Sequence, residues 1–142
     1  MRLLPYSKSI RKRQRQNPKF YLFDLGVQAA LTRNISQPLS VSTYNYGNLF
    51  EQFLILEVFR LMHYHEKEWR LSYLRTQEGV EIDLIVERPG EKTICIEVKS
   101  TNHVKAKDLK SLKALGKDIG DVELLVLSNT TQAQLLLSLI HI

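Results

Sequence analysis

Two stretches of the chain carry charged side chains inside otherwise apolar sequence. Residues 93–100 read TICIEVKS, where Glu97 and Lys99 interrupt an apolar run, and residues 80–88 read VEIDLIVER, where Asp83 does the same. Successive side chains of a strand point to opposite faces, so we expect Glu97 and Lys99 on one face. Carboxylate oxygens are ligands that a divalent cation prefers, and such an ion can keep positions open for water and phosphate.

The turn between these stretches predicts how Asp83 and Glu97 meet. A hairpin centred near Pro89-Gly90 pairs positions whose numbers sum to about 180, which places Asp83 opposite Glu97 with side chains roughly 5 Å apart. Two like charges at this separation destabilise a sheet unless one is protonated or a cation lies between them. Oxygen ligands of this kind suit Mg²⁺ or Mn²⁺. Lys99 would border the metal site.

A third carboxylate lies on a predicted helix. We expect this helix to run from about Leu49 to Tyr64, with Asn48 as its cap. At about 100° per residue, four apolar side chains fall within roughly 60° of Glu51, namely Leu54, Ile55, Val58 and Met62. Glu51 therefore points inward or lines a cleft. Glu57 also has apolar neighbours and remains a second candidate.

The remaining pattern predicts the elements that position these side chains. Before the helix we expect a strand at Lys19–Asp24, a helix at Gly26–Thr32 and a loop at Ile35–Tyr46. After it we expect strands at Trp69–Thr76, Val80–Arg88 and Lys92–Lys99, a helix at Lys105–Asp118 and a strand at Val122–Ser128. The inner stripe of the second long helix would be Leu109, Leu112, Leu115 and Ile119. The order is helix, three strands, helix, strand, which predicts an α/β fold with helices flanking a sheet.

Composition and charge limit the class of protein. The 142 residues are 44% hydrophobic and 25% charged, as expected for one soluble domain with a single core. The first 17 residues carry six basic and no acidic residues, and we expect them to form a basic arm that either contacts phosphates or is a solvated linker. A lone cysteine, Cys95, excludes a disulfide framework, and no apolar stretch reaches the roughly 20 residues that a membrane span needs. We expect a cytoplasmic protein without a membrane partner.

Glu51, Asp83 and the tripeptide Glu97-Val98-Lys99 together resemble the PD-(D/E)XK nuclease superfamily, which includes restriction endonucleases and archaeal Holliday junction resolvases. The resemblance implies a restriction-endonuclease-like core with a mixed sheet over residues 18–130. It also implies that Asp83, Glu97 and the carbonyl of Val98 hold Mg²⁺ or Mn²⁺, with Glu51 reaching the ion directly or through a water, and that Lys99 orients the attacking water or offsets charge. Candidates for contacts with the DNA backbone, or equally for surface solubility, are Arg75, Lys105, Lys107, Lys110 and Lys113.

A closer resemblance covers almost the whole chain. The segments KFYLFDLG, YGNLFEQFLILEV, YLRTQEGVEIDLIVE and IEVKS are similar to the nuclease-like domain of unknown function that follows an ATPase module in prokaryotic AAA-type ATPases. None of the six glycines opens a P-loop, so we expect the ATPase module to be absent from this chain. By the same comparison residues 1–17 resemble a linker, and we expect the apolar tail at 131–142 to be truncated.

These observations leave three interpretations of function. The first is a Mg²⁺-dependent nuclease-like domain that hydrolyses DNA phosphodiesters as a C-terminal fragment of an AAA-type ATP-binding protein. The second is a catalytically inactive nuclease fold that serves that ATPase as a DNA-binding or protein-interaction module. The third is an α/β domain whose carboxylates meet by coincidence.

Overall fold

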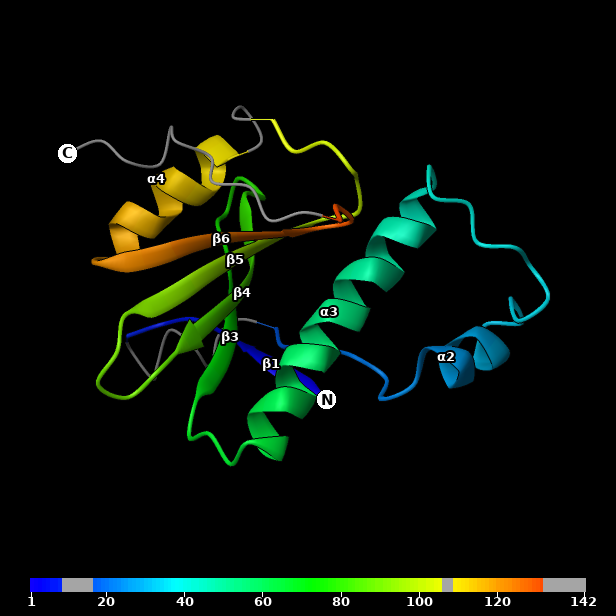
Figure 1. Ribbon diagram of the computed structural model, residues 1–142, viewed down its shortest axis with the longest axis horizontal. Coiled ribbons are helices and arrows are strands. Elements are labelled where there is room, and N and C mark those ends of the chain that lie inside the picture. The colour runs from blue at the N-terminus through cyan, green and yellow to red at the C-terminus, as the bar shows by residue number, and fades with distance from the viewer. Residues whose placement is uncertain (9–16, 106–108, 132–142) are drawn as a thin grey trace.

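The protein has a mixed sheet with one long helix on each face (Figure 1). The computed structural model describes residues 1–8, 17–105 and 109–131. The strands are β1 (Arg2–Pro5), β2 (Lys19–Phe20), β3 (Arg70–Arg75), β4 (Glu81–Glu87), β5 (Thr93–Lys99) and β6 (Val122–Ser128), in the spatial order β2-β1-β3-β4-β5-β6. The helices are α2 (Leu25–Leu31), α3 (Tyr44–Tyr64) and α4 (Lys110–Ile119). The α/β class predicted from the sequence is confirmed.

From α3 onward the elements follow the predicted order. Strands β3, β4 and β5 form an antiparallel meander, and β6 returns parallel to β5 after α4. Both hairpin turns contain a glycine with positive φ, 82° at Gly79 and 77° at Gly90, a conformation that other residues adopt at a cost. The register between β4 and β5 pairs Leu84 with Ile96 and Val86 with Ile94, as the sequence predicted.

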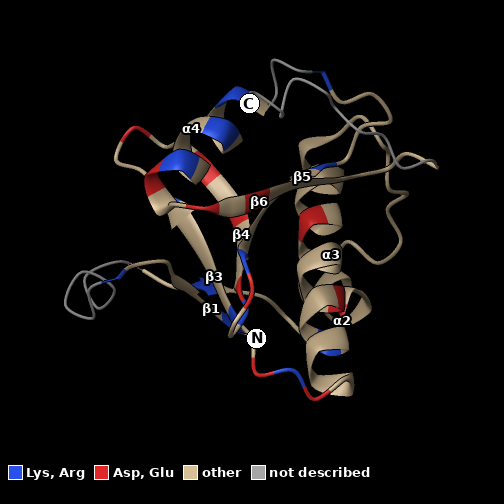
Figure 2. Cartoon of the chain, turned by 60° about the vertical axis from the view of Figure 1, so that its left-hand side comes forward, with Lys and Arg blue, Asp and Glu red and all other residues tan. Residues whose placement is uncertain are grey.

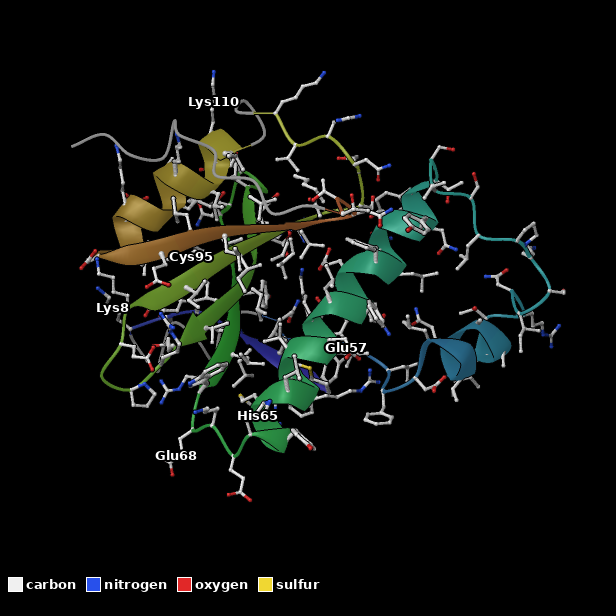
Figure 3. All side chains as sticks on the ribbon, in the orientation of Figure 1. Lys8, Glu57, His65, Glu68, Cys95 and Lys110 are labelled. Carbon is white, nitrogen blue, oxygen red and sulfur yellow. The ribbon has the colours of Figure 1, made fainter. Side chains whose placement is uncertain are left out.

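Each face of the sheet has its own apolar core. On the α3 side, Ile55 packs with Leu84, Val86 and Ile96, and on the α4 side Leu112 packs with Ile82, Ile85 and Cys95. Figure 3 labels Cys95 within the sheet, and its side chain is fully buried. In the predicted inner stripe of α4, Leu109 and Leu112 are fully buried and Leu115 and Ile119 pack partly buried against the same core, which confirms that prediction.

Strand β4 contains a β-bulge at the position of Asp83. Strict alternation along this strand predicts that Ile82 and Leu84 share one face, which is wrong, because Ile82 lies in the core beside α4 and Leu84 in the core beside α3. The pairing of β4 with β3 shifts register between Ser72 and Leu74, so one extra residue is accommodated here. A bulge bends the strand and re-aims a side chain, and such bulges are frequent next to functional sites.

The start of the chain belongs to the sheet. Residues 2–5, within the predicted basic arm, form β1, whose Leu4 and Pro5 pair in parallel with Ser72 and Tyr73 of β3. Leu3 is only 1% exposed and joins the core beside α3. Strand β1 has only four residues and its partner lies far along the chain, so local periodicity in the sequence does not predict this pairing. Four basic residues of the predicted arm lie outside the described residues, as does the predicted tail after position 131; these basic residues are Arg11, Lys12, Arg13 and Arg15.

Capping explains where several elements begin. Helix α3 begins at Tyr44 and not near Leu49, because the Thr43 hydroxyl, 3.2 Å from the Tyr46 nitrogen, caps it in place of Asn48. The predicted strand at Lys19–Asp24 ends at Phe20, and Asp24 caps α2 by accepting the Val27 N–H at 2.9 Å. In the described part of the chain, no helix is both long and apolar enough to cross a membrane.

Candidate functional site

Asp83 lies at the bulge of β4 and contacts the next strand through its side chain. Its Oδ2 accepts the backbone N–H of Val98 at 2.7 Å, and the β4–β5 pairs end one step away, at Leu84 with Ile96. Burial, and then the charge of Glu97, raise the pKa of Asp83 to about 7, although the Val98 hydrogen bond acts in the opposite direction. The two like charges expected from the sequence therefore do repel each other in the folded protein.

Glu97 has one oxygen paired and one oxygen free. Its Oε1 lies 2.7 Å from Lys99 Nζ, whereas its Oε2 is buried without a hydrogen-bond partner among the described residues. The Glu97 side chain is 12% exposed, and that of Lys99 is 36% exposed. A buried carboxylate oxygen without a partner is costly, so this atom is a natural position for a cation or a bound water.

Glu51 faces the sheet from the first half of α3. Its side chain is 25% exposed and lies one turn before Ile55, which is fully buried in the core beside α3. The charge of Glu51 also contributes to the raised pKa of Asp83, after burial and Glu97. Glu57 lies elsewhere, because it pairs with Arg60 at 2.5 Å and Arg60 also contacts the Phe23 carbonyl in the segment before α2. Glu51 is thus the helix carboxylate that shares an electrostatic environment with Asp83.

Lys19 and Tyr21, which the sequence did not single out, complete the cluster. Lys19 Nζ lies 3.2 Å from Glu51 Oε1, also pairs with Glu81, and sits 5.1 Å from the ring centroid of Tyr73. The Tyr21 hydroxyl donates to the same Glu51 oxygen at 3.1 Å. Burial raises the pKa of Tyr21 and the Glu51 charge raises it further, so this hydroxyl remains a donor. The only signal in the sequence was the alternation that places Lys19 and Tyr21 on one face of the segment KFY.

The ammonium of Lys19 stays charged in this position. Burial by itself lowers the pKa of Lys19, but the hydrogen bond to Glu81 and the charge of Glu51 outweigh that effect and raise it. Its side chain is 24% exposed, so the ion pairs are partly shielded from solvent. The charge of Glu51 is therefore neutralised by the ammonium group of Lys19.

The donor set fits a divalent cation only in part. Within residues 1–8, 17–105 and 109–131, no group of three carboxylate, histidine or cysteine side chains is arranged to hold a metal ion. Asp83 and Glu97 supply hard oxygen ligands, and the unpaired Glu97 Oε2 is an atom that a cation would satisfy. Glu51 would complete the set through a water while Lys19 is in place. Val98, whose carbonyl was a predicted ligand, contacts Asp83 through its N–H.

The predicted DNA-contacting residues do not gather at this site. Arg75, whose side chain is 63% exposed, lies at its edge with Nε 3.9 Å from Glu81 Oε2. Lys105 is exposed in the loop before α4, and Lys107 lies outside the described residues. Lys110 and Lys113 are on α4, which packs on the face of the sheet opposite α3 (Figures 2 and 3).

Comparison with known proteins gives one family. The model of the family described as Domain of unknown function (DUF4143) matches residues 46–141. The match includes Glu51, Asp83 and Glu97 but not Lys19 or Tyr21. No curated protein matches the chain, and no solved structure matches it.

Proposed function

We propose that this chain, which belongs to the DUF4143 family, is a Mg²⁺- or Mn²⁺-dependent nuclease-like domain that hydrolyses DNA phosphodiesters. In this proposal its sheet and helices are a restriction-endonuclease-like core, and the domain works as part of an AAA-type ATP-binding protein. The supporting observation is that Asp83 and Glu97 repel each other beside Lys99 while one buried oxygen of Glu97 lacks a partner. A divalent cation would reduce the repulsion between Asp83 and Glu97 and would give the unpaired Glu97 oxygen a partner.

Each charged side chain has a role in this proposal. Asp83 and Glu97 would hold the cation with the carbonyl of Val98, and Glu51 would reach it through a water. A bound divalent cation would polarise the phosphodiester and lower the pKa of its water. Lys99, fixed by its ion pair with Glu97, would offset charge that develops on the phosphate. Arg75, exposed at the edge of the site, would contact the DNA backbone without reading its sequence.

The raised pKa of Asp83 supports a cation site independently of the resemblance. With a pKa of about 7, Asp83 is partly protonated at neutral pH, and that proton reduces its repulsion with Glu97. A divalent cation does the same more completely, because it carries two positive charges and accepts oxygen ligands from both side chains. We therefore expect the site to prefer a cation over a proton as pH rises.

The direct test is cleavage of supercoiled plasmid DNA by the purified protein in Mn²⁺ or Mg²⁺. We expect nicking that stops in EDTA and falls by roughly 100-fold or more in Asp83→Asn and Glu97→Gln, since each removes a ligand. Asp121→Asn is the matched control, because Asp121 is 78% exposed and pairs with Lys92 outside the site. Cleavage that survives Asp83→Asn would contradict the assignment.

The inactive nuclease fold remains a second candidate, and one observation favours it. Glu51 is already neutralised by Lys19 and Tyr21, and no three-ligand group is formed among the described residues. Such a module would bind DNA as tightly in EDTA as in Mn²⁺, and Asp83→Asn would not change its affinity for DNA. If its contacts come from α4, the double variant Lys110→Gln, Lys113→Gln should weaken binding and make it less dependent on salt.

A further inference from the structure

We propose that Lys19 is the resident cation of the metal-free site and limits the access of a divalent cation to Glu51. This inference rests on the proposed metal site and concerns how that site is kept in its metal-free form. It predicts that the protein binds divalent cations weakly as it stands and that removal of one lysine makes it a tighter binder.

The contacts of Lys19 connect three elements of the fold. Its ammonium, on β2, pairs with Glu51 of α3 and with Glu81 of β4, above the ring of Tyr73 on β3. The Glu51 oxygen that it contacts also accepts the Tyr21 hydroxyl. An oxygen that already accepts two hydrogen bonds has little capacity left for a metal ion. Glu51 can therefore offer this oxygen to a metal ion only after the ammonium withdraws, and until then it has only Oε2 as a direct ligand.

The charges around Lys19 show why its presence matters for metal affinity. The cluster contains the four carboxylates of Glu51, Glu81, Asp83 and Glu97, and the two ammonium groups of Lys19 and Lys99. The charge of Lys19 is near enough to lower the pKa of Asp83, so it also repels a cation bound there. Replacing Lys19 with a neutral residue removes this repulsion and one of the two hydrogen bonds that occupy Glu51 Oε1. Both effects strengthen cation binding.

The position of Lys19 allows it to move without disturbing the core. Strand β2 has two residues and lies at the edge of the sheet. Within the described part of the chain it pairs only with β1, through Arg2 with Phe20 and Leu3 with Lys19. Phe20 is 73% exposed, so this strand contributes little to the packed interior. Short edge elements with few buried contacts open at lower free energy than core strands. Displacement of Lys19 is thus compatible with an intact sheet.

The test is a calorimetric titration with MnCl₂ alone, accompanied by melting curves with and without Mn²⁺. We expect Lys19→Met to bind Mn²⁺ at least about tenfold more tightly than the wild type and to show a larger Mn²⁺-induced rise in melting temperature. Lys19→Arg keeps the charge and should resemble the wild type. Lys92→Met is the matched control, because its ion pair with Asp121 is exposed and outside the site. Adding Asp83→Asn to Lys19→Met should abolish the binding.

The outcomes separate this inference from the proposed function. Equal affinities in the wild type and Lys19→Met, with binding lost in Asp83→Asn, would overturn the role of Lys19 and leave the metal site standing. Absence of Mn²⁺ binding in both would overturn the role of Lys19 and the metal site together. Lys19→Gln, which keeps a donor for Glu51 without the charge, provides the same comparison if Lys19→Met does not fold.

Discussion

Asp83→Asn should make the metal-free protein more stable at high pH. The pKa of Asp83 is about 7 in the folded protein against 3.8 for an unperturbed aspartate, chiefly because of burial and then because of Glu97. The folded state thus binds this proton more tightly than the unfolded state. The resulting stability is fully present below about pH 4 and is lost as the pH rises through about 7. Asparagine keeps an acceptor for the Val98 N–H and has no charge to lose.

The size of the effect follows from the pKa difference of about three units. Each unit corresponds to about 1.4 kcal/mol, so the ionisation of Asp83 costs up to roughly 4 kcal/mol of unfolding free energy by pH 8. Because part of the side chain is accessible to water, we expect a measured change of about 2–4 kcal/mol. Most of it should appear between pH 4 and pH 7.

The measurement is urea unfolding in EDTA at several pH values between 4 and 8, for the wild type, Asp83→Asn and the surface control Asp121→Asn. As pH rises, the unfolding free energy of Asp83→Asn should increase relative to that of the wild type. The unfolding free energy of Asp121→Asn should change with pH as that of the wild type does. Glu97→Gln should reduce the pH dependence, since it removes the second cause of the raised pKa. A difference between the wild type and Asp83→Asn that stays constant with pH would refute the reasoning.

Two further predictions concern the helices that hold the site. Leu112→Ala removes a fully buried side chain from the core between α4 and the sheet and should cost about 2–5 kcal/mol of unfolding free energy, measured in urea at fixed pH against the exposed control Lys117→Ala. Thr43→Ala removes the hydroxyl that caps α3 and should cost about 1 kcal/mol in the same assay, whereas Thr43→Ser should cost little; equal losses in both would contradict the capping role.

The parts of the site that the sequence predicted are those set by short-range geometry. The turn at Pro89-Gly90 determines the register of β4 and β5, so counting outward from it was enough to pair Leu84 with Ile96, one step from Asp83 and Glu97. The periodicity of α3 likewise placed Glu51 on the stripe of Ile55. In both cases the residues concerned are connected by one turn or one helix, whose geometry varies little between proteins.

The parts of the site that the sequence did not predict depend on contacts between segments far apart along the chain. Lys19 meets Glu51 and Glu81 across 32 and 62 residues of chain, and β1 pairs with β3 across 68, distances at which no local pattern carries information. The bulge at Asp83 was hidden for another reason. Strand β4 is buried on both faces, with Leu84, Ile85 and Val86 all at most 2% exposed, so polar and apolar residues do not alternate along it. An extra residue therefore does not interrupt any visible pattern in the sequence.

The charge of the site bears on the choice between the two proposed functions. A surface that only binds DNA needs positive charge, because most of its affinity comes from neutralising phosphates. Here Glu51, Glu81, Asp83 and Glu97 share one region with two lysines, and a phosphodiester approaching it would meet repulsion unless Asp83 were protonated or a cation were present. DNA contact at this site should therefore depend on divalent cations. If DNA binds equally in Mn²⁺ and in EDTA, and Arg75→Gln has no effect on either, the DNA-binding surface lies elsewhere on the domain.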